Sequence, residues 1–382
     1  MDIKKEYERW LANATADADV AAELKTLDDA KVEDAFYRDL AFGTGGLRGV
    51  IGAGTNRMNI YTVAKASQGL ADYLKKNFAE PSVAIGYDSR IKSDVFAKVA
   101  AGVFAANGVK VNIWPVLMPV PTVSFATRYL HTSAGVMVTA SHNPGKYNGY
   151  KVYGADGCQI TTEAAAEILA EIEKLDIFAD VKTSDFEAGV TSGNIQYIPD
   201  EVYTAFVNEV KNQSVLFGEE VNKDVAIVYS PLNGTGLKPV TRTLKEMGYT
   251  NITVVKEQEQ PDGHFPTCPY PNPEIRQAMT EGVGRDIRDS QTMGYETYYY
   301  AVLLPNGEIL RMAQDAETVW SIYDSTLPAI VLSCVALMLA AAVLAALLTR
   351  ALVSPVLSMT EDLDHIQDNV PYKELVPFAE SI

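Results

Sequence analysis

The chain has 382 residues, of which 47% are hydrophobic and 21% charged, so it can bury the cores of two or three domains and is not a disordered protein. Its formal net charge of −17 excludes nucleic acid as an expected partner, because nucleic-acid binding depends on Lys and Arg that neutralise phosphates. The cysteines Cys158, Cys268 and Cys334 lie far apart, so neither a disulfide framework nor a zinc site is expected.

Strand-like and helical patterns alternate along the chain up to about residue 277. Short apolar runs predict buried strands at 83–86, 109–113, 135–138 and 225–228. Longer patterned segments predict helices at 61–78, 93–107, 161–175, 200–211 and 236–247. Ser93 suits a helix N-cap, and Gly108 and Gly248 suit helix C-terminal ends. Strands that alternate with helices in this way indicate an α/β layered architecture.

A strand hairpin and then a long apolar segment are expected after about residue 280. The apolar-rich runs 298–304 and 308–312 flank Asn306-Gly307, and Asn-Gly between two such runs is a strong hairpin signal. Residues 325–349 carry no charge, and as a helix they would rise about 37 Å, enough to cross a bilayer core of about 30 Å. A buried core helix is the alternative, but such a helix seldom stays uncharged on every face. We therefore predict a membrane span at 325–349.

A short polar segment directly follows the strand predicted at 135–138. It reads Thr-Ala-Ser-His-Asn-Pro over 139–144 and places Ser141 beside His142. A Ser-His pair at the end of a strand can serve nucleophilic catalysis, although no Gly-x-Ser-x-Gly frame of the hydrolase type surrounds Ser141. The alternative is structural, with Ser141 as a helix N-cap and the following Asn-Pro as a turn.

The wider sequence favours catalysis over that structural alternative. Together with Tyr-Asn-Gly-Tyr-Lys at 147–151, the segment resembles the phosphoserine loop of the α-D-phosphohexomutases, the phosphoglucomutase and phosphomannomutase group. Three further segments match the family in the expected order: Gly-Thr-Gly-Gly-Leu-Arg-Gly at 43–49, Pro-Leu-Asn-Gly-Thr-Gly at 231–236, and Pro-Asp-Gly-His-Phe-Pro-Thr at 261–267 with Pro-Asn-Pro-Glu at 271–274. The resemblance covers about residues 1–279.

This resemblance implies an exchange of phosphoryl groups between the 1- and 6-positions of a hexose phosphate, with glucose 1,6-bisphosphate as activator. Ser141 would carry the phosphoryl group, and His142 would orient it or assist proton transfer. Arg48 can offer a bidentate fork to a phosphate, and Lys151 can transfer protons if its pKa is lowered. With Thr44, these two residues form the implied substrate-binding set. Taken alone, His142 is compatible with an ordinary loop histidine and Arg48 with a surface ion pair.

Members of this family hold Mg²⁺ with an Asp-x-Asp-x-Asp loop and with the phosphoserine, which would make Ser141 a ligand through its phosphate. No Asp-x-Asp-x-Asp segment occurs in the sequence. The pairs Asp286/Asp289 and Asp362/Asp364 have other surroundings and are interpreted as solvated carboxylates. The family's third and fourth domains are also unmatched, so we expect a truncated chain without mutase activity.

Residues 281–382 resemble part of a Gram-positive sensor histidine kinase of the phosphate-regulon type. The resemblance covers the end of an extracytoplasmic sensing domain, a membrane helix and a HAMP-like linker from Pro355 onward. His365 lacks the Glu-Leu-Arg that follows a phospho-acceptor histidine, so it is interpreted as a solvated loop residue. A sensing domain belongs outside the cell, whereas the mutase-like part belongs in the cytoplasm. Both parts precede the same membrane span, so a single crossing would leave them on the same side of the membrane. Arg350 is the only sequence signal for orientation.

The expected fold class is α/β, with a phosphohexomutase domain 1 and an incomplete domain 2, followed by a small β-hairpin segment and a single transmembrane helix. The expected domains are 1–200 and 201–279 for the mutase-like parts, 280–324 for the sensor segment, 325–349 for the membrane helix and 350–382 for the linker. The leading hypothesis is a mutase module joined near residue 280 to a sensor fragment, as a chimaeric reading frame. The alternatives are a membrane-anchored, non-catalytic sugar-phosphate-binding protein and a signalling protein that uses the mutase-like domain as its sensor.

Overall fold

The computed structural model describes residues 2–215, 220–268, 272–290, 295–305, 307–315, 317–354, 357, 370 and 372–379. It divides into two compact units, Met1–Asn272 and Pro273–Ile382, which are described separately below. The sequence places the join near residue 280, and the domain boundaries proposed from the sequence stay predictions.

The first unit is built on a seven-stranded sheet in the order β1-β2-β6-β5-β3-β4-β7. Its strands are β1 (Phe42–Gly43), β2 (Gly46–Val50), β3 (Ser82–Tyr87), β4 (Lys110–Ile113), β5 (Ala134–Val138), β6 (Tyr147–Gly154) and β7 (Ile195–Tyr197). Strand β3 runs parallel to β4 and β5, whereas β6 runs antiparallel to β5 and β2. Tyr87 pairs with Val138 at the ends of β3 and β5, so the loops that follow these two strands start at the same edge of the sheet.

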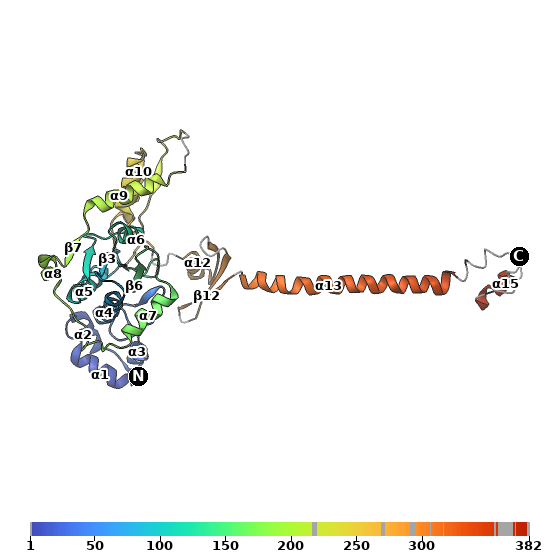
Figure 1. Ribbon diagram of the computed structural model, residues 1–382, viewed down its shortest axis with the longest axis horizontal. Helices are drawn as coiled ribbons and strands as arrows, with labels where there is room; N and C mark the ends of the chain where they lie inside the picture. Colours follow the sequence, from blue (N-terminus) through green and yellow to red (C-terminus); the bar gives the residue numbers. More distant parts are fainter. Residues whose placement is uncertain are drawn as a thin grey trace. The chain divides into compact units, whose positions relative to one another are not determined.

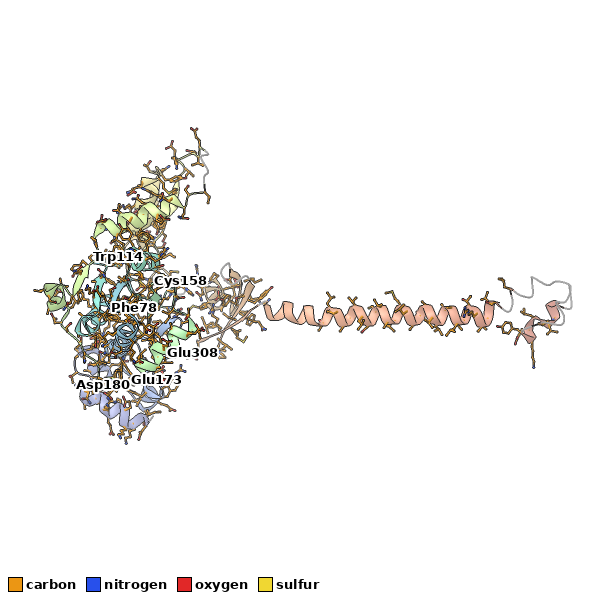
Figure 2. The ribbon with its side chains drawn as sticks, viewed as in Figure 1. Phe78, Trp114, Cys158, Glu173, Asp180 and Glu308 are labelled. Carbon is orange, nitrogen blue, oxygen red and sulfur yellow. The ribbon has the colours of Figure 1, made fainter. Side chains whose placement is uncertain are left out.

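Helices cover both faces of this sheet (Figure 1). On one face lie α4 (Ile60–Asn77), α5 (Ser93–Ala106) and α7 (Thr162–Ile172), and on the other lie α6 (Val120–Tyr129) and α9 (Asp200–Asn212). The apolar centre of β3 is buried on both faces of the sheet: Val83 and Ile85 belong to the first core, and Ala84 belongs to the second. The second core also contains Trp114, which is labelled in Figure 2.

A third core anchors the N-terminal helices α1 (Ile3–Asn13), α2 (Ala18–Leu24) and α3 (Asp29–Phe36). Trp10 is fully buried at its centre, with edge-to-face contacts to three rings at centroid distances of 5.4–5.7 Å: Phe36, Tyr61 and Phe178. Each ring comes from a different part of the chain, so this cluster holds the N-terminal helices onto the sheet domain.

The predicted elements of the first unit are confirmed with small changes at their ends. Helix α7 ends at Ile172 rather than at 175, and β8 starts at Ile227 rather than at 225. Gly108 and Gly248 adopt positive φ angles of 76° and 92° after helix ends, as expected. The prediction that Ser93 caps a helix was wrong: the cap is the preceding residue, and the Ser93 hydroxyl donates to Asp88 at 2.8 Å.

The remainder of the first unit is a small parallel βαβ segment. Strands β8 (Ile227–Tyr229) and β9 (Ile252–Val254) form a two-stranded sheet connected through α10 (Leu237–Glu246) and followed by α11 (Lys256–Glu259). Val228 in β8 is 74% exposed, so one apolar side chain of this small sheet faces solvent. A short helix α8 (Phe186–Ser192) packs on the first core near α5.

The second unit begins with helix α12 (Pro273–Glu281), which packs on an antiparallel sheet of β10 (Val283–Ser290), β11 (Tyr295–Leu303) and β12 (Ile309–Asp315). The Glu274 carboxylate is fully buried and pairs with Arg311 Nε of β12 at 2.7 Å. Strands β11 and β12 confirm the expected hairpin, and Gly307 in its turn has a φ angle of 82°. Asn306 lies outside the described residues.

A long helix, α13 (Glu317–Leu348), follows the sheet and continues into a π-helical turn, η1 (Thr349–Val353). Residues Thr326–Val353 have a mean hydropathy of 2.8, and none of the apolar window is buried (Figure 2). The long helix expected at 325–349 is therefore confirmed, although it starts earlier, and the membrane crossing stays a prediction. Beyond it lie η3 (Lys373–Leu375) and α15 (Val376–Ala379); His365, Pro355 and most of the expected HAMP-like linker fall outside the described residues.

Candidate active site

Ser141 lies in the loop that connects β5 to the antiparallel strand β6. The loop starts at the carboxyl edge of the parallel strands, where open α/β sheets bind their ligands. The φ angle of Ser141 is 57°, in the left-handed region, which costs about 1–2 kcal/mol for a residue with a side chain. Strain of this kind clusters at functional sites, and the exposed Ser141 side chain is available to a ligand.

The backbone of Ser141 is held indirectly by a half-buried acid in the loop that follows the neighbouring strand β3. Asp88 follows β3 and accepts hydrogen bonds from the hydroxyls of Thr139, at 2.5 Å, and Ser93, at 2.8 Å. Thr139 Oγ1 in turn accepts the N–H of Ser141 at 2.9 Å. Burial raises the pKa of Asp88, while these hydrogen bonds and the nearby Arg90 charge act in the opposite direction.

His142 lies next to the proposed nucleophile. Its Nδ1 atom is 3.2 Å from Ser141 Oγ, within hydrogen-bonding distance, and both side chains are exposed. A neutral imidazole with Nδ1 unprotonated would accept the Ser141 hydroxyl proton, and a protonated one would donate to an oxygen at the same position. The geometry therefore suits both roles that the sequence suggested for His142.

The two cations expected at the site, Arg48 and Lys151, lie on the adjacent strands β2 and β6. Arg48 pairs with Gly149, and Lys151 is two residues farther along β6, so both side chains leave the same face of the sheet. Burial lowers the pKa of Lys151 and the Arg48 charge lowers it further, whereas Asp88 acts in the opposite direction. The structure thus supplies the condition that proton transfer by Lys151 requires.

Thr44, the remaining predicted substrate-binding residue, is exposed in the turn between β1 and β2. A cleft of about 280 Å³ opens at Ser141 and His142. Its other lining residues come from the Arg90 region, the phosphoserine-like loop, the 231–236 turn and the 265–268 loop: Arg90, Asn143, Pro231, Leu232, Gly234, Thr235, Gly236, Phe265 and Cys268. The cleft therefore gathers two of the five predicted residues, while Thr44, Arg48 and Lys151 are not among its lining.

Sequence reasoning missed Asp88 and Arg90. The signal was present, because the polar run Asp88-Ser89-Arg90 follows directly after a predicted buried strand, where functional side chains of α/β proteins concentrate. It also missed Asn148, which is fully buried on β6 and donates to Ile91 O and Ser93 Oγ, both at 3.0 Å. These residues connect the loop after β3 to the Ser141 loop.

The residues present do not fit the Mg²⁺ site that the resemblance implies. Among the described residues, no group of three or more His, Cys, Asp or Glu side chains could hold a metal ion. Asp262 near the cleft is engaged by His264, whose Nδ1 lies 3.2 Å from Asp262 Oδ1.

Comparison with known proteins gives matches over the first unit and slightly beyond it. Residues 39–177 match the model of phosphoglucomutase/phosphomannomutase α/β/α domain I, and residues 204–294 match that of domain II. The second match runs past the join expected near residue 280.

Individual relatives agree with these matches. A phosphoglucomutase from Staphylococcus saprophyticus is 37% identical over 280 residues, which are 73% of this chain and 50% of the relative. A phosphoglucomutase from Staphylococcus haemolyticus is 38% identical over 247 residues, 65% of this chain and 44% of the relative. The chain thus spans about half the length of the curated relatives it matches.

A crystal structure of a phosphomannomutase candidate from Thermus thermophilus has a similar fold. Its TM-score is 0.52 at 23% identity, and the match covers 71% of this chain and 58% of that one. At this identity the likeness supports the fold and carries no statement about substrate.

Proposed function

Because residues 39–177 and 204–294 belong to the phosphoglucomutase/phosphomannomutase family, we propose that Ser141 accepts a phosphoryl group from a hexose phosphate and returns it to one. The observation that carries this proposal is the placement of Ser141. It sits in a left-handed conformation at the carboxyl edge of the sheet, lines a cleft of about 280 Å³, and has His142 Nδ1 at 3.2 Å from its Oγ.

The proposed transfer proceeds as follows. A bond forms between Ser141 Oγ and the phosphorus of a hexose bisphosphate, and the bond between that phosphorus and the sugar oxygen breaks. The Ser141 proton passes to His142 Nδ1, and the sugar oxygen takes up a proton as it leaves. The reverse step gives the phosphoryl group back to a hexose monophosphate. Positioning and charge neutralisation dominate the rate of such transfers.

The two cations are proposed to act on the sugar side of this reaction. Arg48, always charged, would hold a phosphate of the substrate, with Thr44 donating from the adjacent turn. Lys151, with its lowered pKa, would exchange a proton with the sugar oxygen. Glucose 1,6-bisphosphate is the proposed activator, because it can load Ser141 directly.

We propose that Ser141 can still be phosphorylated although the complete mutase reaction is slow or absent. The sequence has no Asp-x-Asp-x-Asp loop, and the charge on the transferring group would therefore lack the stabilisation that such a loop supplies. We propose that the chain undergoes the phosphoserine half-reaction in the cytoplasm while interconverting glucose 1-phosphate and glucose 6-phosphate slowly or not at all.

The test is to incubate the full chain in detergent micelles with glucose 1,6-bisphosphate and to measure Ser141 phosphorylation by peptide mass spectrometry. We expect a phosphopeptide containing Ser141 in the wild type and none in Ser141→Ala. A coupled dehydrogenase assay for glucose 6-phosphate should stay at background. Phosphorylation at another residue, with Ser141 unmodified, would refute the proposal.

A second candidate function, membrane anchoring, is favoured by helix α13. The 28 residues of Thr326–Val353 would rise about 42 Å, and their apolar window is not buried. This length exceeds a bilayer core of about 30 Å. We propose that this helix crosses a membrane and that the residues after the domain II match, about 295–382, are a sensor-kinase fragment with a HAMP-like linker, so that the chain would be a membrane-anchored sugar-phosphate binder or a chimaera.

Membrane insertion can be tested by carbonate extraction of membranes from cells that express the chain. The wild type should stay in the pellet. Leu339→Lys places a charge near the centre of the helix, which costs about 3 kcal/mol on insertion, and should move a measurable fraction to the supernatant. Thr349→Lys, near the helix end, is the matched control and should behave as the wild type. A wild type that is extracted as a soluble protein would exclude the anchor.

A further inference from the structure

The guanidinium group of Arg90 lies beneath the Ser141 loop and is the centre of its hydrogen bonding. Arg90 is 4% exposed. Its NH1 donates to the carbonyls of Pro144, at 3.1 Å, and Tyr147, at 3.0 Å. Its NH2 donates to the carbonyls of Ser141, at 2.8 Å, and Asn143, at 2.5 Å. One side chain thus collects four carbonyls from a single short loop.

The same turn after β3 holds both backbone groups of Ser141. Arg90 binds the Ser141 carbonyl, and Asp88 holds the Ser141 N–H through the Thr139 hydroxyl. Asp88 and Arg90 are also linked to each other, with Arg90 Nε 3.5 Å from Asp88 Oδ2. Hydrogen bonds to the carbonyl and to the N–H of Ser141 therefore hold its left-handed backbone conformation and leave its Oγ to other partners.

The direction of the loop carbonyls matters for a phosphoryl group. Four carbonyl oxygens point toward the Arg90 charge, so their negative ends are turned inward. Turned outward, the same oxygens would repel the doubly negative phosphoryl group that the proposed function places on Ser141. A planar guanidinium with five N–H donors can hold four carbonyls at once, whereas the three donors of a lysine ammonium leave from one nitrogen.

A loop of the second domain covers this guanidinium. The ring centroid of Phe265 lies 5.0 Å from Arg90 Cζ, and Phe265 itself has a left-handed φ of 51°. The two loops fit closely, since a Cβ on Gly145 would come 2.8 Å from Gly263 O and a Cβ on Gly263 would come 2.6 Å from Ile91 N. The ring keeps water from competing for the Arg90 donors and offers its negative face to the cation.

We propose that Arg90, covered by Phe265, is the positioning residue that shapes the Ser141 loop for phosphoryl transfer. This inference rests on the proposed function of Ser141 and adds a residue that acts through the loop rather than on the phosphoryl group. It also assigns the 265–268 loop of the second domain a role in supporting a site on the first.

The first measurement is the initial rate of Ser141 phosphorylation by glucose 1,6-bisphosphate, on the full chain in detergent. We expect Arg90→Ala to lower the rate about 100-fold, as small displacements of a reacting group do. Arg90→Lys should lower it about 10-fold, since it loses several hydrogen bonds to a charged group, and Phe265→Leu should fall between the wild type and Arg90→Lys. The matched control is Arg57→Ala, whose guanidinium also donates to backbone carbonyls, those of Asp34 and Asn56, outside the site. Its rate should stay within about 2-fold of the wild type.

Chemical rescue separates positioning from general support of the fold. Free guanidinium at millimolar concentration should restore the Arg90→Ala rate about 5-fold or more by occupying the vacated space. The wild type and Arg57→Ala should not respond. The second measurement is amide exchange, where peptides spanning 139–147 should exchange faster in Arg90→Ala while β3 and β5 keep the wild-type rates.

The two proposals can fail separately. If wild-type Ser141 takes no phosphoryl group, the proposed function fails; loop exchange that rises in Arg90→Ala and falls again with guanidinium then still establishes the positioning of the loop by Arg90. If Arg90→Ala is phosphorylated at the wild-type rate, or if its loop exchanges as in the wild type, the inference is overturned. Equal acceleration of exchange in the loop and in the strands, without rescue by guanidinium, overturns it as well, because Arg90 would then support only the fold.

Discussion

Asn233 is expected to be a large determinant of stability in the loops that line the cleft. It is 4% exposed and has a left-handed φ of 56°. Its Nδ2 donates to the carbonyls of Glu257, at 3.3 Å, and Gln260, at 3.0 Å, and its Oδ1 accepts from Thr267 Oγ1 at 3.0 Å. One side chain thus ties the 231–236 turn to the segment that leads to Phe265.

The expected cost of Asn233→Ala follows from these contacts. Three hydrogen bonds at about 1 kcal/mol each give about 3 kcal/mol, and the left-handed conformation adds about 1 kcal/mol for alanine. We therefore expect a loss of about 4 kcal/mol, a large fraction of the roughly 5–15 kcal/mol typical of a domain. Asn233→Gly tolerates the left-handed conformation and loses only the three hydrogen bonds, so its cost should be about 3 kcal/mol.

Urea unfolding of the full chain in detergent, followed by pulse proteolysis of the first unit, measures these differences. The matched control is Asn251→Ala, because Asn251 is exposed and its Nδ2 makes one bond, to Asp224 O at 3.2 Å. It should cost less than about 0.5 kcal/mol. Equal midpoints for Asn233→Gly and the wild type would show that the three side-chain bonds contribute nothing and would refute the reasoning.

Other substitutions test the core and the electrostatics of the site. Tyr150→Phe removes a buried hydrogen bond of 3.0 Å with Ser67 and should cost about 1–2 kcal/mol in the same unfolding assay; an unchanged midpoint would contradict this. In the proposed transfer Lys151 gives a proton to the leaving sugar oxygen, so the rate of Ser141 phosphorylation should fall at alkaline pH. Because the Arg48 charge lowers the pKa of Lys151, Arg48→Met should move this fall to higher pH, and a shift to lower pH would exclude Lys151 as the group that titrates. Burial raises the pKa of Asp88 above its unfolded value of 3.8, so at pH values above 3.8 the Asp88 carboxyl stays protonated in the folded state while it ionises in the unfolded state. The free energy of unfolding therefore falls as pH rises through the folded pKa. Asp88→Asn should remove that fall. If the free energy of unfolding of Asp88→Asn falls with pH as steeply as that of the wild type, Asp88 is not the responsible group.

The sequence alone was sufficient for features that depend on neighbouring residues. Apolar runs located β3 and β5, because the centres of strands covered on both faces are apolar. The buried Val109, Val111 and Ile113 located β4, although its Lys110 is exposed. The uncharged stretch located α13, and Asn-Gly located the β11–β12 hairpin, since both signals act over a few consecutive residues. The Ser-His segment at 139–144, together with the motifs at 43–49, 231–236 and 261–274, likewise indicates the family from local sequence.

Only the tertiary structure decided which distant residues serve Ser141. The antiparallel insertion of β6 between β5 and β2 brings Lys151 beside Arg48, and this pairing depends on strand order, which local sequence does not encode. Ser93 was expected to cap a helix because its local context suits a cap. Its hydroxyl donates to Asp88 instead and accepts from Asn148 Nδ2 of β6, a partner that only the fold brings near. In the sequence nothing distinguishes Arg90 from other cations. The fold makes it part of the site, because it brings four backbone carbonyls and the Phe265 ring next to the guanidinium.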